Sequence, residues 1–138
     1  APLLDDGRFQ GVVNFVMLNP STADAELDDP TRGYGGLTVT NLYAFRATDP
    51  RELKRAADPI GEWNSRYVRA FASDADMTVC AWGNNAEPYH AEEVLGWLLE
   101  SSENVTALRV SKAGQPCHPL YLPGDLKPQP FGAGGRAA

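Results

Sequence analysis

The chain has 138 residues, of which 43% are hydrophobic, and this length suits one domain with a substantial core rather than two. Its formal net charge of -6 argues against a broad basic surface that coats duplex DNA, although a small local basic patch is compatible with it. No segment resembles a signal peptide, and no apolar run reaches the roughly 18 residues that span a bilayer. We therefore expect a cytoplasmic protein that has no contact with a membrane.

The N-terminal part of the chain predicts three strands. Asp6-Gly7 is a hairpin turn signal, so the first residues are expected to add an antiparallel edge strand. Residues 12–18 and 37–45 are short runs rich in β-branched and aromatic residues, which is typical of strands. Between them only Arg32 separates two turn-like elements, which is very short for a crossover between parallel strands. Either a loop with a short helix connects the two strands, or residues are missing here.

The middle of the chain predicts three helices and a third strand. Residues 48–56 contain a capping-box signature with a proline at the first helical position. In residues 61–73 the spacing of the apolar side chains is that of an amphipathic helix, which buries such a face against the core. These side chains are Trp63, Tyr67, Val68 and Phe71. Residues 90–101 show the same spacing, with Val94, Leu95, Trp97 and Leu98. The run at 77–83 predicts the strand between these two helices.

A fourth strand is predicted at residues 105–110, and the alternation of strands and helices is typical of an α/β fold. Strand-helix-strand connections imply a parallel sheet with right-handed crossovers. We therefore predict a single three-layer α/β domain over residues 1–126, with a central four-stranded parallel sheet and the antiparallel N-terminal edge strand. The Pro- and Gly-rich residues 127–138 are expected to be an irregular or disordered tail.

Polar residues lie at the carboxyl ends of all four predicted parallel strands. Ligands bind at this edge of an open α/β sheet, because the loops converge there and helix N-termini point at it. The residues concerned are Asn19, Asn41, Arg46, Trp82, Gly83, Asn84 and His118. Some of them also have a structural interpretation: Trp82 suits a core position, and Gly83-Asn84 suits a tight turn. Asn41 favours a functional role, because asparagine is disfavoured in strands and a buried amide must find partners.

The histidines and cysteines give weaker indications of function. Prolines on both sides hold the segment of His118 extended, which suits a ring that must be aimed. Cys117 should point away from His118, so a Cys-His nucleophile pair is not expected. His90 opens a helix and is expected at the surface. Cys80 and Cys117 match no zinc or disulfide spacing, and we predict no metal and no cofactor.

Two groups of charged residues flank the predicted site. Arg46 begins the strongest local basic cluster, which could hold a phosphate. Its other members are Arg51, Lys54 and Arg55. An acidic run after Asn19 comprises Asp24, Glu26, Asp28 and Asp29. We interpret this run as a solvated face, because sites for hard cations usually assemble from separate segments.

Four sequence blocks resemble, in this order, a bacterial and phage domain family of unknown function. The blocks are FVMLNPSTAD, GYGGLTVTNLYAFRATDP, AWGNNA and GQPCHPLYLP. In that family a further helical stretch precedes the second block, which favours missing residues at Arg32. More distantly, the order of the blocks is similar to that of the uracil-DNA glycosylase superfamily. The matching residues are Asn19-Pro20, Asn41, Trp82-Gly83 and His118-Pro119.

The glycosylase resemblance implies a glycosylase-like fold and hydrolysis of an N-glycosidic bond. Asn19 would position the water, and turnover would be slow because an amide is not a strong base. Pro20 and Ser21 would shape the pocket and offer N–H groups, although Ser21 also suits a helix N-cap. Asn41 would read the Watson–Crick edge of a flipped base, and Tyr43 would stack on it. His118 would donate a hydrogen bond to the departing base.

The loop after His118 departs from the glycosylase pattern, because Leu120 and Tyr121 stand where serines are expected. They suit either a wedge that fills the vacated base stack or core packing. The leading hypothesis is hydrolysis of an N-glycosidic bond, with a nucleobase, a nucleotide or locally unpaired DNA as the partner. The alternative is a non-catalytic module that binds a nucleotide or modified base. A metal-dependent hydrolase built on the acidic run ranks third.

Overall fold

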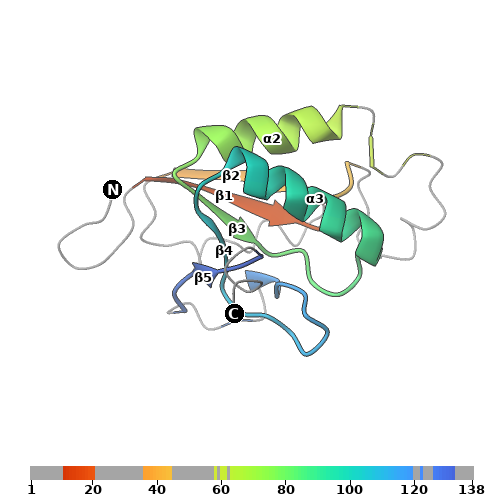
Figure 1. Ribbon diagram of the computed structural model, residues 1–138, viewed down its shortest axis with the longest axis vertical. Helices are drawn as coiled ribbons and strands as arrows, with labels where there is room; N and C mark the ends of the chain where they lie inside the picture. The colour runs from red at the N-terminus through yellow and green to blue at the C-terminus, as the bar shows by residue number, and fades with distance from the viewer. Residues whose placement is uncertain are drawn as a thin grey trace.

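The computed structural model describes residues 11–20, 36–44, 58, 60, 61, 63–119, 122 and 126–132. These residues form a five-stranded sheet with the strand order β2-β1-β3-β4-β5 (Figure 1). The strands are β1 (Val12–Met17), β2 (Gly36–Asn41), β3 (Met77–Cys80), β4 (Val105–Ala107) and β5 (Gln129–Pro130). The first four are parallel to their neighbours, and β5 is antiparallel to β4. The four predicted parallel strands are thus confirmed, although each ends earlier than predicted.

The composition of β1 and β3 follows from their central position. β1 lies between β2 and β3, and all of its residues except Val12 are buried. All four residues of β3 are buried as well. A parallel strand that is covered on both faces is a nearly continuous apolar run instead of an alternating one. VVNFVM and MTVC have this pattern, each with one buried polar residue, Asn14 and Thr78.

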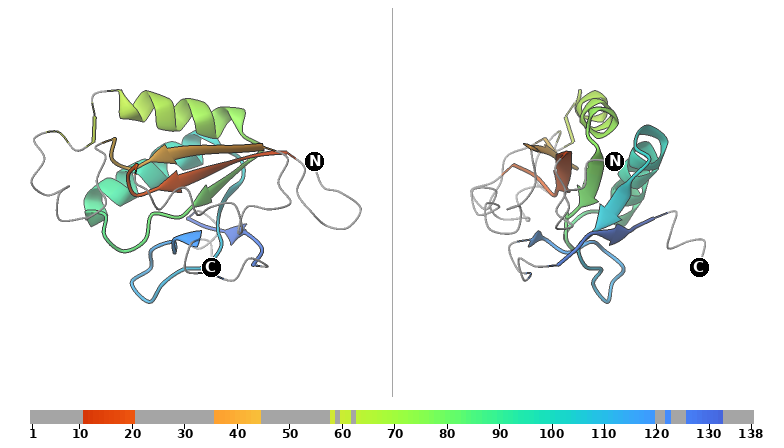
Figure 2. Two further views of the ribbon diagram at one scale, coloured as in Figure 1. Left: turned by 180° about the vertical axis from the view of Figure 1, so that it is seen from behind. Right: turned by 90° about the vertical axis from the view of Figure 1, so that its left-hand side faces the viewer.

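Two described helices cover one face of the sheet, α2 (Asn64–Asp74) and α3 (Pro88–Ser101) (Figure 2). α3 begins two residues earlier than predicted. Pro88 occupies its first turn, and the Glu87 carboxylate caps it by accepting from the N–H groups of Tyr89 and His90. No helix in the described part of the chain is long and apolar enough to cross a membrane. The helix predicted at residues 48–56 lies outside the described residues.

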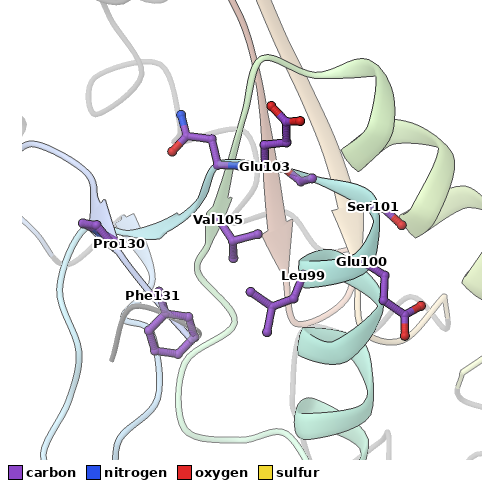
Figure 3. Close-up of a pocket in the computed structure, with 9 residues that line it drawn as sticks. Leu99, Glu100, Ser101, Glu103, Val105, Pro130 and Phe131 are labelled. Carbon is purple, nitrogen blue, oxygen red and sulfur yellow. Dashed lines mark hydrogen bonds between the residues drawn. The ribbon is translucent and has the colours of Figure 1, made fainter. Parts of the chain in front are cut away.

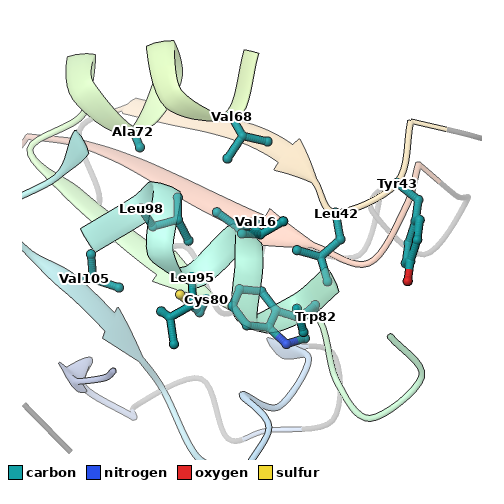
Figure 4. Close-up of a cluster of buried hydrophobic side chains, with 12 residues drawn as sticks. Val16, Leu42, Tyr43, Val68, Ala72, Cys80, Trp82, Leu95, Leu98 and Val105 are labelled. Carbon is teal, nitrogen blue, oxygen red and sulfur yellow. The ribbon is translucent and has the colours of Figure 1, made fainter. Parts of the chain in front are cut away.

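The sheet has a buried apolar cluster on each face. The helix-side core lies between the sheet and the two helices (Figure 4). It includes Val16, Leu42, Tyr43, Val68, Cys80, Trp82, Val94, Leu95 and Leu98. The opposite-side core consists of Val13, Phe15, Met17, Met77, Val79, Ala81 and Leu108. None of its members comes from a described helix, so the predicted third layer stays a prediction.

β5 is a difference from the sequence prediction. It lies within residues 127–138, which we expected to be irregular, and it pairs with β4 through Gln129 and Pro130. The next residue, Phe131, packs against the helix-side core and places its ring edge against Trp82, with 6.2 Å between the ring centroids. A two-residue strand that contains a proline has no detectable periodicity. The predicted N-terminal edge strand falls in residues 1–10, outside the described part of the chain.

The orientation of α2 also differs from the prediction. Of its four apolar side chains, only Val68 is buried; Trp63, Tyr67 and Phe71 are 52%, 59% and 40% exposed. The helix faces the sheet instead through Asn64, Val68 and Ala72, at positions i, i+4 and i+8. The predicted burial of the aromatic side chains is therefore wrong, because the line of small and polar residues packs closer to the strands.

Candidate functional site

Asn19 and Asn41 lie at the carboxyl ends of neighbouring strands. Asn41 is the last residue of β2 and pairs in register with Met17 of β1. Beyond the strands, the Leu42 N–H still donates to the Met17 carbonyl at 2.9 Å, and the Tyr43 N–H donates to the Leu18 carbonyl at 3.0 Å. Asn19 therefore follows β1 directly beside the end of β2. The structure places these two predicted site residues at one edge of the sheet.

The side chain of Asn41 has a buried oxygen without a partner. Among the described residues, no group donates a hydrogen bond to its Oδ1. Asn14 is different: it is fully buried, but its amide oxygen accepts from Thr38 and its Nδ2 donates to Thr40. A buried acceptor without a donor costs about 1–3 kcal/mol, so its presence requires an explanation. The second such atom, Oγ1 of Thr78, belongs to a residue with no exposed surface, whereas Asn41 is half-buried.

The backbone next to Asn41 is fixed from the helix side. Nδ2 of Asn64 donates to the carbonyls of Asn41 and Leu42 at 2.7 and 3.1 Å. Nε2 of His90 lies 2.7 Å from the same Leu42 carbonyl. Two buried polar side chains from two helices thus hold the end of β2, so the Asn41 amide is not required for this. Sequence reasoning missed both, and the only available signal was a polar residue in the first turn of each helix.

The predicted surface position of His90 is wrong. The residue is 5% exposed, and its ring lies between those of Tyr43 and Trp97, with centroid distances of 5.0 and 6.1 Å. Because α3 begins at Pro88, His90 lies one turn before Val94 on the buried face of the helix. Its Nδ1 lies 3.3 Å from a Glu93 carboxylate oxygen.

Tyr43 belongs to the helix-side core and is 6% exposed. Its hydroxyl oxygen accepts from the Glu87 N–H at 3.0 Å. Burial raises the pKa of the Tyr43 hydroxyl, and the Glu87 carboxylate raises it further, while the hydrogen bond from the Glu87 N–H acts in the opposite direction. These contacts explain the residue structurally, and its predicted stacking role stays a prediction.

Trp82, Gly83 and Asn84 bind the loop that follows β4. The indole Nε1 of Trp82 donates to Gln115 Oε1 at 2.8 Å, and the Gly83 N–H donates to the Pro116 carbonyl at 2.7 Å. The Ser111 hydroxyl donates to Asn84 Oδ1 at 2.7 Å. Trp82 is also in the helix-side core, and Gly83 has a φ of +76°, which favours glycine. These contacts correspond to the structural interpretation, and a ligand-binding role stays a prediction.

The same loop determines where His118 lies. The Cys117 N–H donates to the Arg109 carbonyl at 2.8 Å, so the loop folds back on itself as it leaves β4. Pro116 bonds to Gly83 at the end of β3, which brings the following residues toward the centre of the sheet edge. Leu122 then packs against the opposite-side core. His118 is thus half-buried near the carboxyl ends of the strands, and burial lowers the pKa of its imidazole.

The lowered pKa of His118 predicts a pH-dependent contribution to stability. Above the unfolded pKa of 6.5 the ring is neutral in both states, and the folded protein has its full stability. As the pH falls from 6.5 to the lower folded pKa, the unfolded chain binds the proton more readily than the folded protein does, so stability is lost. We expect the free energy of unfolding of wild type, relative to His118→Gln, to be smaller at pH 5 than at pH 7.5 in urea titrations. An equal difference at the two pH values would contradict the predicted pKa shift.

The other predicted site residues are only partly described. Asn19 is 7% exposed, and its Nδ2 donates to the carbonyl of the half-buried Pro20 at 3.1 Å. Burial raises the pKa of the Cys80 thiol, which makes it a poor nucleophile. In the part of the chain that the structure describes, no three His, Cys, Asp or Glu residues form a possible metal site.

Several predicted residues lie outside the part of the chain that the structure describes. They are Ser21, Arg46, Arg51, Lys54, Arg55, Leu120, Tyr121 and the acidic run.

A surface hollow of about 660 Å³ lies elsewhere, between the end of α3, the start of β4 and β5 (Figure 3). Leu99, Val105 and Phe131 form its apolar part, and Glu100 and Glu103 lie on its rim. Because β4 begins here, the hollow is at the amino edge of the parallel strands. It is therefore separate from the edge where Asn19 and Asn41 lie.

Comparison with known proteins identifies the family of this chain. No curated protein and no solved structure matches it significantly, so neither comparison supports a relationship with the glycosylases. A family model matches residues 9–120, which is most of the chain. The match includes Asn19, Asn41, the Trp82-Gly83-Asn84 segment and His118. The chain therefore belongs to the family described as protein of unknown function (DUF1643).

Proposed function

We propose that the carboxyl edge of the sheet binds a nucleobase, and that the protein hydrolyses the N-glycosidic bond of that base in DNA or a nucleotide. The observation that supports this proposal is the buried Oδ1 of Asn41, for which the described residues provide no donor. An N–H group on the edge of a base is a donor of the right kind and would satisfy this oxygen. The cost of the unpaired oxygen in the free protein would then be recovered on binding.

The position of Asn41 supports selective recognition. Asn64 of α2 donates to the Asn41 carbonyl, and both Asn64 and His90 of α3 contact the carbonyl of the next residue, Leu42. An amide held in place before the ligand arrives loses little conformational freedom on binding. A base that lacks a donor at this position would leave the oxygen unpaired, so the site would discriminate between bases by their edges.

The proposed reaction breaks the bond between the base nitrogen and C1′ of the sugar, and water forms a new bond to C1′. The electron pair of the broken bond stays on the base. His118, whose lowered pKa favours the neutral imidazole, would donate an N–H hydrogen bond to the charge that develops there. Asn19 would orient the water through its side-chain amide. The proton that the water loses would pass to solvent, because an amide is too weak a base to accept it.

A second candidate is a module that binds the nucleobase without cleaving it. The observation that favours it is that Asn19, at the position proposed to hold the water, has a neutral amide that cannot accept a proton. The carboxylate of Glu87, which follows the Trp82-Gly83-Asn84 segment, is already bound to two helix N–H groups. If no group at this edge activates water, the same site would bind a nucleotide and release it unchanged.

The two candidates differ in their products. We expect incubation with oligonucleotides carrying uracil, mismatched or hypermodified bases to produce abasic sites from at least one of them, measured as strand cleavage after alkali. If no abasic site forms but nucleotides raise the melting temperature, the binding module is correct. If neither result is obtained, and calcium or manganese raises the melting temperature instead, the third hypothesis of a metal site on the acidic run is favoured.

A further inference from the structure

The helix α2 lies at one side of the molecule (Figure 1). Its outward face is unusually aromatic for a peripheral helix. Trp63, Tyr67 and Phe71 are each at least 40% exposed, and they follow one another at intervals of four residues. Surface aromatic residues of this size, together with arginine, are enriched at the centres of protein interfaces. The guanidinium of Arg66 stacks on the Trp63 ring, with 4.6 Å between Cζ and the ring centroid. The face therefore has the composition of an interface.

The spacing along this face is that of a helix that packs against another helix. Trp63, Tyr67, Ala70 and Asp74 are all exposed and are separated by four, three and four residues. This alternation is the spacing of the contact positions in paired helices. Ala70 is the small residue in the line, and it leaves room for a large side chain from the opposite helix.

The charges on this face of α2 are complementary to those on the same face of a second copy. Arg66 lies near the start of α2, and Asp74 is its last residue. Among the described residues, Arg69 has a carboxylate within salt-bridge distance, that of Glu100, whereas Arg66 has none. If two copies of α2 pack antiparallel, Arg66 and Trp63 of each copy lie beside Asp74 of the other. A parallel arrangement would place like charges together, so the charge pattern selects the antiparallel one.

We propose that this face of α2 is a self-association surface, on which a second copy of the chain packs with its α2 antiparallel. A two-fold axis between Tyr67 and Ala70 places each Tyr67 ring over Ala70 of the other copy, and it forms two equivalent Arg66-Asp74 ion pairs. Such a two-fold arrangement is the commonest symmetry of soluble homo-oligomers. Because an 11-residue helix is only about 16 Å long, the interface is small and the dimer is weak and concentration-dependent.

A partner made of nucleic acid fits this face less well. On this face Arg66 is exposed, and no carboxylate of the described residues pairs with it. The whole chain has a net charge of -6. Phosphate backbones are bound by several cations acting together. A second copy, in contrast, provides both an apolar surface and the carboxylate that Arg66 lacks.

The test is sedimentation equilibrium of the full chain from about 1 μM to 1 mM, with charge exchange between the two positions. We expect a monomer-dimer equilibrium in wild type, weakened at least about tenfold by Arg66→Asp and by Asp74→Arg, since each places like charges together. Combining the two substitutions restores opposite charges and should return the dissociation constant to within about threefold of wild type. Tyr67→Ala should also weaken the dimer, whereas Tyr89→Ala, at an aromatic residue that is 77% exposed on α3, should not.

Three results would overturn the proposal. One is a monomer over the whole concentration range. Another is a dimer that none of the α2 substitutions affects, which would place the interface elsewhere. The third is a combined variant that dimerises no better than the single ones, although circular dichroism shows that it is folded. If the single variants lost dimerisation because they misfold, combining them would not restore it. Restored dimerisation in the combined variant therefore distinguishes charge repulsion from misfolding.

Discussion

Replacing His118 with alanine is expected to lower the rate of base release by about 10²–10³-fold, because removal of one preorganised donor to a developing negative charge has an effect of that size. The side chain is half-buried, so water does not replace the lost donor with the same geometry. The measurement is single-turnover cleavage of the oligonucleotide on which wild type is fastest. Circular dichroism and thermal melting of the variant show whether it is folded.

Two further variants define the role of His118. His118→Gln keeps an N–H donor and should recover part of the lost rate. Cys117→Ser changes the neighbouring side chain but keeps the backbone N–H that donates to Arg109, so its rate should stay within about twofold of wild type. If His118→Ala cleaves as fast as wild type, His118 does not interact with the departing base, and the proposed mechanism is wrong.

Replacing Phe15 with alanine is expected to lower the free energy of unfolding by about 3–5 kcal/mol. Phe15 has no exposed surface and belongs to the opposite-side core, where it pairs in register with Val39 and Val79 on the two neighbouring strands. The loss combines the transfer of the ring to water with the cavity that remains in the centre of the sheet. Urea unfolding at neutral pH measures it.

The matched control for Phe15→Ala is Tyr89→Ala, because Tyr89 is also aromatic but is 77% exposed. Tyr89→Ala should change the free energy of unfolding by no more than about 0.5 kcal/mol. If Phe15→Ala proves too unstable to purify, Phe15→Leu keeps much of the volume and should have a smaller, measurable cost. A cost below about 1 kcal/mol for Phe15→Ala would mean that this face of the sheet is not a packed core.

The parallel sheet was predictable because β1, β3 and β4 are buried almost throughout and therefore appear in the sequence as short, mostly apolar runs. The edge strand β2 is only partly buried, and its β-branched residues indicated it instead. Their order in space depends on which loops cross which faces, and no pattern in the strands themselves encodes it. β5 was missed for a different reason: two residues, one of them a proline, contain too little information to predict a strand. Its place in the sheet follows from Phe131, which packs against Trp82.

The direction in which α2 faces shows the limit of hydrophobic periodicity. The aromatic line through Trp63, Tyr67 and Phe71 has helical spacing, but so does the line through Asn64, Val68 and Ala72, which is the one that packs on the sheet. The second line is preferred because small side chains allow a close approach and because Asn64 donates to the carbonyls at the end of β2. Neither effect can be detected without knowing where β2 ends.

The candidate site was predictable as an edge but not as a set of contacts. Asn19 and Asn41 could be placed together because the ends of parallel strands share one side of a sheet. The roles of Trp82, Gly83 and Asn84 could not be predicted, because their hydrogen bonds depend on how the loop after β4 folds back. A single sequence also gives no sign that Oδ1 of Asn41 is buried without a donor. Its burial without a donor can be seen only in the structure.

The most direct test of the proposed site is calorimetric titration of uracil, thymine, cytosine, adenine, guanine and their nucleoside monophosphates into wild type and Asn41→Leu. Leucine has nearly the shape of asparagine but cannot form the hydrogen bond to a base. We predict that at least one compound binds wild type and binds the variant at least about tenfold more weakly. The melting temperature of Asn41→Leu should be no lower than that of wild type, because the unpaired Oδ1 is removed. Equal affinity of the two proteins, or the absence of binding by every compound, would contradict the proposed nucleobase site.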